Sequence, residues 1–104
     1  MQRKALKMFL LPGKEAEYKK RHDEIWPELV ELLKSVGIQN YSIFLDTETL
    51  VLFAYLEAED LSQLDHLSQL PIMQKWWAYM ADIMESNLDH SPKSVEIPSV
   101  FYLA

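Results

Sequence analysis

The chain has 104 residues, of which 49% are hydrophobic. This length is enough for one compact core and too short for two. Ten Lys and Arg against sixteen Asp and Glu leave a net charge of −6, without the basic surface that neutralises nucleic-acid phosphates. We therefore expect a single domain over residues 1–104 and no DNA or RNA partner.

Cysteine is absent, which excludes disulfides, thiolate nucleophiles and thiolate-bound metals and fits a reducing compartment. The apolar run near the N-terminus covers only residues 8–11, which is too short for a signal-peptide core or a membrane span. We expect a cytoplasmic protein with no membrane partner.

In the first third of the chain, Pro12-Gly13 is a turn signal that ends a strand predicted over residues 3–11. Helical spacing of apolar residues begins at Lys14, but Pro27 interrupts it. Proline breaks a helix interior and is tolerated at its first position. The pattern therefore predicts two helices, over residues 14–22 and 27–35, separated by a kink at residues 23–26.

The remaining elements follow in order. Residues 38–46 and 50–57 are rich in β-branched and aromatic side chains and predict a hairpin. Asp60 is a plausible N-cap for a short helix. Pro71 opens another helix, whose apolar residues share one face: Ile72, Met73, Trp76, Met80 and Ile83. Beyond them we expect a loop over residues 85–93 and a last strand over residues 95–103, with Pro98 at a bulge or an edge.

The order β-α-β-β-α-β is that of an α+β, ferredoxin-like sandwich with its helices on one face of a four-stranded sheet. Both faces of the hairpin are apolar: Ile43 points one way, while Phe44 points the other. An exposed apolar sheet face is unusual in a monomer, so we expect a second copy to cover it and form a dimeric α/β barrel. Such an architecture does not by itself define a chemistry.

The side chains best suited to chemistry are aromatic or imidazole. Tyr18 and His22 are four residues apart and share a helical face. Histidine moves protons near neutral pH, and tyrosine offers a hydroxyl. The competing interpretation is a solvated histidine and core aromatic residues. Trp76 and Trp77 diverge by about 100° on a helix, so one could pack in the core and the other face a cleft; both could also be core.

Other cofactor and metal chemistry is disfavoured. His66 and His90 lie in polar segments and are expected to be solvated, and no histidine spacing suits a metal. Gly13 and Gly37 are the only glycines, so neither a phosphate-binding loop nor a serine nucleophile elbow is present. We expect no metal and no cofactor.

Four segments of the chain form a distinctive combination: Arg21 to Leu29, Asn40 to Asp46, Trp76 to Met80 and Val100 to Leu103. The first contains an Arg-His-x-x-Ile-Trp-Pro-Glu stretch, and the third contains a Trp-Trp pair. Together they resemble the L-rhamnose mutarotase family. The resemblance covers nearly the whole chain in order, and only residues 85–93 fit loosely.

The resemblance implies a homodimeric α/β barrel that equilibrates α- and β-L-rhamnose ahead of the isomerase step of rhamnose catabolism. By position, His22 is similar to the family's proton donor, and Tyr18, Tyr41, Trp76 and Trp77 are similar to its sugar-contacting residues. Ring opening and closure is general acid–base catalysis. The base is left open between Tyr18, an acidic side chain and water.

Two other classes remain open from the residues alone. One is a cofactor-free oxygenase or a haem-handling protein of the same dimeric barrel type, in which His22 and the tryptophan pair would serve an aromatic substrate or an iron. The other is a ligand-binding module without catalysis. Oxygen consumption or a Soret band would distinguish the first class from a mutarotase.

Overall fold

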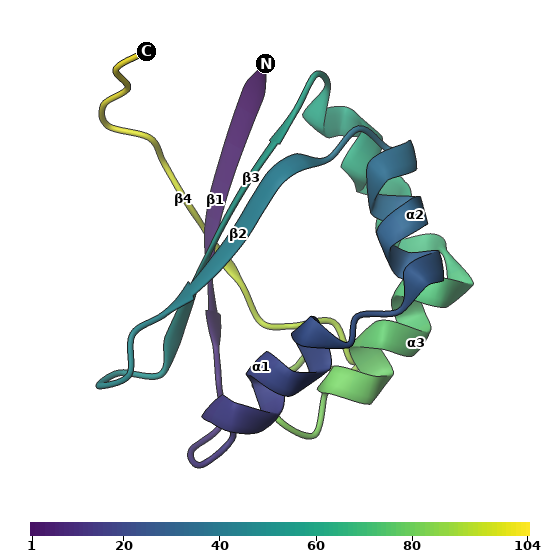
Figure 1. Ribbon diagram of the computed structural model, residues 1–104, viewed down its shortest axis with the longest axis vertical. Helices are drawn as coiled ribbons and strands as arrows, with labels where there is room; N and C mark the ends of the chain where they lie inside the picture. Colours follow the sequence, from purple (N-terminus) through teal and green to yellow (C-terminus); the bar gives the residue numbers. More distant parts are fainter.

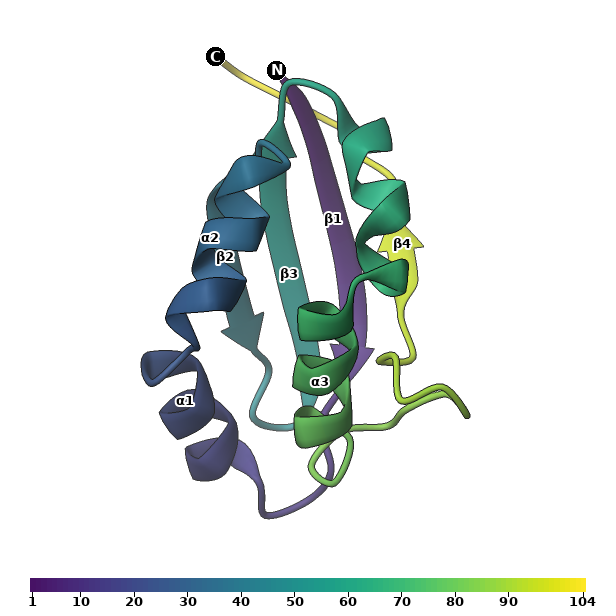
Figure 2. The ribbon, with the colours of Figure 1, turned by 90° about the vertical axis from the view of Figure 1, so that its right-hand side faces the viewer.

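The computed structural model describes all 104 residues. One four-stranded antiparallel sheet, with strand order β2-β3-β1-β4, is covered by helices on a single face (Figure 1, Figure 2). The expected α+β, ferredoxin-like fold is confirmed. The elements are β1 (Gln2–Phe9), α1 (Glu15–Asp23), α2 (Pro27–Ser35), β2 (Gln39–Leu45), β3 (Val51–Ala58), the 3₁₀ helix η1 (Leu61–Gln69), α3 (Pro71–Met80) and β4 (Val95–Ile97).

The helical region after β1 breaks where the sequence predicted. Trp26 has extended backbone angles, and Pro27 occupies the first turn of α2, where its missing N–H costs no hydrogen bond. Acidic residues stand in the first turn of α1 and basic residues in its last turn, which complements the helix dipole. The break lets α1 and α2 lie at different angles beside the sheet (Figure 1).

The last strand is much shorter than expected. β4 covers only Val95–Ile97, so the strand predicted over residues 95–103 is confirmed at its start and was wrong from Pro98 onward. Pro98 has no N–H to donate to a ladder, so pairing with β1 stops before it. The apolar tail beyond it is solvent-exposed: the exposed fraction is 78% at Phe101 and 80% at Leu103.

Smaller differences occur at other ends. β1 ends at Phe9, although Leu10 still bridges to Met84, and α3 ends at Met80, so Ile83 lies beyond the helix although it is buried. The short helix after β3 is a 3₁₀ helix, and its predicted cap is confirmed: the Asp60 side chain accepts a hydrogen bond from the Ser62 N–H at 3.0 Å.

A β-bulge reshapes β2. Gln39 pairs with Glu57 and Ser42 with Tyr55, so Asn40 and Tyr41 together oppose one residue of β3. Asn40 has a φ of 49°, and its amide nitrogen donates to Glu57 Oε1 at 2.9 Å. The extra residue places Gln39 on the outer face and Tyr41 on the helix side, where it lines the cavity described below.

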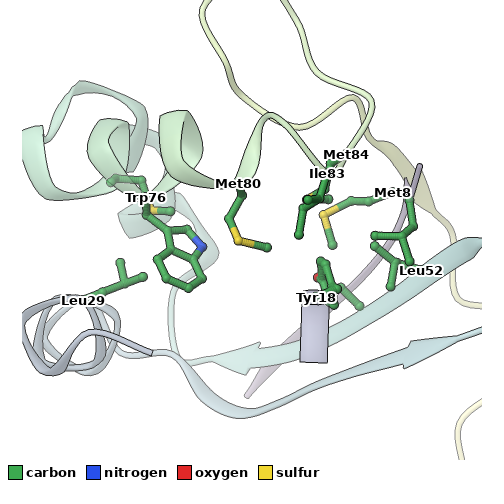
Figure 3. Close-up of a cluster of buried hydrophobic side chains, with 11 residues drawn as sticks. Met8, Tyr18, Leu29, Leu52, Trp76, Met80, Ile83 and Met84 are labelled. Atoms are coloured by element: carbon green, nitrogen blue, oxygen red, sulfur yellow. The ribbon is translucent and has the colours of Figure 1, made fainter. Parts of the chain in front are cut away.

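The core occupies part of the space between the sheet and the helices (Figure 3). Leu29, Leu52 and Ile83 are its largest fully buried side chains, each 1% exposed. The opposite face of the sheet carries Phe44 and Phe53 as a cross-strand pair, and no helix covers them. The apolar character of both faces of the β2–β3 hairpin is therefore confirmed. None of the helices is long and apolar enough to cross a membrane.

Candidate active site

A cavity of about 1170 Å³ opens between the sheet and the helices, and a chamber of about 80 Å³ adjoins it. Nine residues line both spaces, so the chamber is a side compartment of the same site. All five residues that the sequence singled out line both spaces: Tyr18, His22, Tyr41, Trp76 and Trp77. The fold therefore brings together residues from α1, the β2 bulge and α3.

His22 is held between two aromatic rings. Its imidazole stacks on Tyr18 with centroids 4.3 Å apart, and it meets Trp76 edge-on at 5.4 Å. The first contact follows from the four-residue spacing on α1, whereas the second joins α1 to α3. These two contacts fix the orientation of the ring toward the cavity.

The hydrogen bonding of His22 determines its tautomer. Nδ1 lies 3.1 Å from the backbone carbonyl oxygen of Tyr18. A carbonyl oxygen only accepts, so Nδ1 carries the hydrogen, and in the neutral ring Nε2 is an acceptor. Burial lowers the pKa of His22, against smaller raising effects from the Tyr18 carbonyl and Asp23. Near neutral pH the ring is therefore neutral and offers Nε2 as a proton acceptor.

Tyr18 is suited to donate a hydrogen bond. Its side chain is 8% exposed and lies among the core residues (Figure 3). Burial raises the pKa of its hydroxyl, and the nearby Tyr41 raises that pKa further. The hydroxyl consequently stays protonated at physiological pH, which disfavours Tyr18 as the base that the sequence left open.

The two tryptophans occupy different environments. Trp76 is 6% exposed and belongs to the core cluster while also lining the cavity, whereas Trp77 is half-buried at the cavity wall. Trp26 and Tyr79 pack against Trp76 with centroid separations of 5.1 and 5.8 Å. Neither Trp26 nor Tyr79 lines the cavity. The break before Pro27 moves Trp26 away from the helical face that carries Tyr18 and His22. Both rings instead pack against Trp76 outside the cavity.

Arg21 is a structural residue that sequence reasoning missed. Its guanidinium bonds to Glu17 at 2.7 Å, to Asp82 at 2.8 Å and to the Tyr79 carbonyl oxygen at 2.6 Å, and it lies over the Tyr79 ring. These contacts raise the pKa of Arg21 and lower that of Asp82. They attach the last turn of α1 to the end of α3, which keeps His22 beside Trp76.

The loop between α3 and β4 was also missed as part of the site. Asn87, Asp89 and Ser91 line the large cavity, and His90 lines the small chamber. His90 is exposed, as expected, but it borders the site and has a φ of 72°. His66 is exposed and lines neither space. No group of three or more His, Cys, Asp or Glu side chains is placed to hold a metal ion.

The sequence model of the family described as L-rhamnose mutarotase matches residues 3–103. The chain belongs to the L-rhamnose mutarotase family. The L-rhamnose mutarotase of Listeria monocytogenes serovar 1/2a is 56% identical over 104 residues, and that of Lachnoclostridium phytofermentans is 52% identical over 103 residues. The first alignment covers 100% of both chains and the second 99% of both.

Solved structures agree with this assignment. The crystal structure of the L-rhamnose mutarotase from Formosa agariphila superposes with a TM-score of 0.94 at 45% identity, over 100% of both chains. An antibiotic biosynthesis monooxygenase shares the fold alone, with a TM-score of 0.61 at 16% identity, covering 96% of this chain and 99% of that one.

In this member of the L-rhamnose mutarotase family, the cavity combines three chemical features. Trp76 and Trp77 provide an aromatic wall, Tyr18 provides a buried hydroxyl, and His22 presents a free imidazole nitrogen. A wall of this kind suits the C–H face of a sugar, and an imidazole near neutral pH suits proton exchange with its hydroxyls.

Proposed function

We propose that the chain is an isomerase of the aldose 1-epimerase type that interconverts the α and β anomers of L-rhamnose. His22 is its proton-transfer group. The observation that carries this proposal is the free Nε2 of His22 at the cavity wall, in a chain related over its full length to L-rhamnose mutarotases. The reaction moves only protons and one C–O bond.

The proposed cycle begins with neutral His22. Nε2 takes the proton of the anomeric hydroxyl, the C1–O5 bond breaks with its electron pair on the ring oxygen, and the imidazolium then gives its proton to that oxygen. Rotation of the aldehyde about C1–C2 and the same steps in reverse close the ring on the other face. His22 is thus first the base and then the proton donor that the family resemblance implied.

The other four predicted residues bind the sugar in this proposal. The Tyr18 hydroxyl donates to a sugar oxygen, because burial keeps it protonated. Tyr41, on the β2 bulge, contributes a second hydroxyl, and Trp76 and Trp77 face the apolar side of the ring. L-rhamnose, a 6-deoxy sugar, presents both a methyl group and hydroxyls, so its site needs both aromatic side chains and hydrogen-bonding groups.

The experiment is exchange NMR on the anomeric protons of L-rhamnose with and without protein. Positioned proton transfer contributes about 10²- to 10⁴-fold, so added protein should speed the exchange well above the rate in buffer. An oxygenase or a haem protein would instead consume oxygen or show a Soret band. No observation in the site favours that class, since the monooxygenase likeness extends to the fold alone.

The proposal includes a homodimer in the cytoplasm. Support for the dimer comes from the outer face of the sheet, where Phe44 is 67% and Phe53 40% exposed. Apolar patches of this kind commonly mark protein interfaces. A second copy packed sheet to sheet would cover them and leave each cavity on its own helix side. Light scattering tests the dimer, and cell fractionation tests the location.

A further inference from the structure

The loop over residues 85–94 is a polar wall of the cavity with no role in the cycle above. It joins the end of α3 to β4 (Figure 2). Asn87, Asp89 and Ser91 line the large cavity, and His90, beside Asp89, lines the small chamber together with His22. The loop therefore borders the same compartment as the proposed proton-transfer group.

Hydrogen bonds within the loop hold its polar side chains in place. The Ser91 N–H and hydroxyl both donate to Asp89 Oδ1, at 2.9 and 2.5 Å, and the Asn87 amide nitrogen donates to the Ser91 hydroxyl at 3.0 Å. The Asn87 N–H donates to the Ser91 carbonyl at 2.8 Å. The Asp89 carboxylate is thus oriented before any ligand arrives.

Three carboxylates line the cavity, and they differ in availability. Asp23 Oδ2 accepts from Lys19 Nζ at 2.8 Å, so that oxygen already has a protein partner. Glu15 lies seven residues before His22, which is about 10 Å along the helix axis, and it accepts from the Gly13 N–H. Asp89 has only neutral donors on Oδ1, and Oδ2 has no protein partner. The Ser91 donors also lower the pKa of Asp89, so it is ionised at neutral pH.

A bound sugar presents several hydroxyl donors, and an ionised carboxylate is the strongest acceptor that a side chain offers them. The aromatic residues line other parts of the cavity and cannot supply such an acceptor. We infer that Asp89 is a sugar-binding residue whose Oδ2 accepts a hydrogen bond from a ring hydroxyl of the substrate. This inference rests on the proposed function and adds a contact that sets both the orientation of the sugar and the specificity of the site.

Asp89→Asn tests the contact with little change in shape. The amide oxygen can still accept from Ser91, whereas the free acceptor is replaced by an NH₂ donor. Loss of a hydrogen bond to a charged group corresponds to about 10- to 100-fold. We expect KM for L-rhamnose to rise by at least about tenfold, with a smaller change in kcat. Leu88→Ala is the matched control, because Leu88 lies in the same loop, is fully exposed and lines neither space.

Sugars lacking one ring hydroxyl distinguish contact from a loosened loop. With the wild-type protein, kcat/KM for one of the three sugars (2-, 3- or 4-deoxy-L-rhamnose) should be lower than kcat/KM for L-rhamnose. The factor should be about the same as the factor by which Asp89→Asn lowers kcat/KM for L-rhamnose. The variant should use that deoxy sugar as well as it uses L-rhamnose, because the two changes remove the same interaction. If the effect of Asp89→Asn and the effect of removing a hydroxyl add for all three sugars, the inference is overturned, since Asp89 would then act only through the fold.

Failure of the inference and failure of the proposed function give different results. An unchanged KM in Asp89→Asn, beside active wild-type protein, overturns the inference alone. Absence of exchange with the wild-type protein overturns the proposed function. Circular dichroism checks the fold of the variant, and Asp89→Ala with the same three derivatives replaces Asp89→Asn if that protein is unfolded.

Discussion

The hydrogen bond from His22 Nδ1 to the Tyr18 carbonyl decides what the imidazole can do when it is neutral. A proton on Nδ1 leaves Nε2 as an acceptor, and only a second proton makes the ring a donor on that side. The same group can therefore take the proton of O1 and return it to O5, two oxygens on one carbon. A separate base is not required by this geometry.

The pH profile follows from the charge of His22. Burial holds its pKa below the ordinary value of about 6.5. If the neutral ring starts the cycle, kcat/KM corrected for the buffer rate should rise as pH increases to that pKa and then stay level to about pH 9. The measurement is exchange NMR from pH 4.5 to 9, with His22→Gln as the control that loses the profile. Activity that falls as pH rises through this range would show that the protonated ring starts the cycle.

The aromatic wall gives a second prediction at the residue scale. L-rhamnose should perturb tryptophan fluorescence, and D-glucose should do so at least about tenfold more weakly, since its extra hydroxyl would be buried without a partner. Trp26 lies 5.1 Å from Trp76 and adds to the signal. Titrations should therefore be repeated with Trp76→Phe and Trp77→Phe. If neither substitution alters the response, these rings do not form the sugar wall.

The individual site residues were predictable where they share an element or a distinctive motif. The proximity of Tyr18 to His22 follows from helical spacing, whereas the roles expected for these residues and for the tryptophan pair came from the family resemblance. Arg21 could not be recognised, because its partner Asp82 is 61 residues away and the local charge run is typical of a solvated surface. Asp89 belongs to a loop without periodicity, so only the folded chain places it at the cavity.

At the scale of elements, the site depends on the junction of α1 with the end of α3. Arg21 makes this junction, and its side chain is only 10% exposed although its partner Asp82 is 66% exposed. Solvent screening reduces the contribution of such an ion pair to stability, whereas the hydrogen bond to the Tyr79 carbonyl oxygen adds to the stability of the junction.

Arg21→Met should lower stability by about 1 kcal/mol, which corresponds to a fall in Tm of roughly 4–8 °C in a domain of this size. Methionine keeps an apolar chain similar to that of arginine, so the loss of stability measures the contribution of the polar contacts of Arg21. Lys19→Met is the control: it breaks an ion pair that is exposed on both sides, and its Tm should hardly change. Equal melting temperatures for all three proteins would show that the junction does not depend on Arg21.

Elements were predictable where the local sequence settles the backbone. Pro27 determines the break between α1 and α2, and the turn between β2 and β3 falls between two strongly β-forming runs. The prediction that the last strand extends to Leu103 was wrong because the local sequence does not determine pairing. Val100 to Leu103 have strand-forming side chains, but a strand also needs a neighbour, and pairing with β1 ends at Ile97. The bulge at Asn40 likewise depends on pairing with β3 and left no local signal.

At the scale of the whole molecule, the two sheet faces have different surroundings. Ile43 pairs with Ala54 on the helix side, whereas Phe44 pairs with Phe53 on the uncovered side. The sequence showed that both faces of the hairpin were apolar but left open which residues would face a partner. Alternation along a strand shows which residues share a face, but it does not show which face the helices cover. The structure shows that Phe44 and Phe53 lie on the uncovered face, which is the face that the proposed partner would cover.

Phe53→Lys should convert the proposed dimer into a folded monomer, because it places a charge in the uncovered face. Ile43→Lys should instead give unfolded or insoluble protein, because its side chain packs against the core. Light scattering at micromolar concentration, with circular dichroism, measures both. A monomeric wild-type protein would refute the dimer, and a dimeric Phe53→Lys would place the interface elsewhere.

The central claim is that His22 carries the proton in L-rhamnose mutarotation. Exchange NMR on the α and β anomeric protons of L-rhamnose, with wild-type protein and His22→Ala at equal concentration, tests it most directly. The account predicts rapid exchange with the wild-type protein and a loss of about 10²-fold, or roughly 2.7 kcal/mol of barrier, in a folded His22→Ala. Wild-type exchange rates in folded His22→Ala would contradict it.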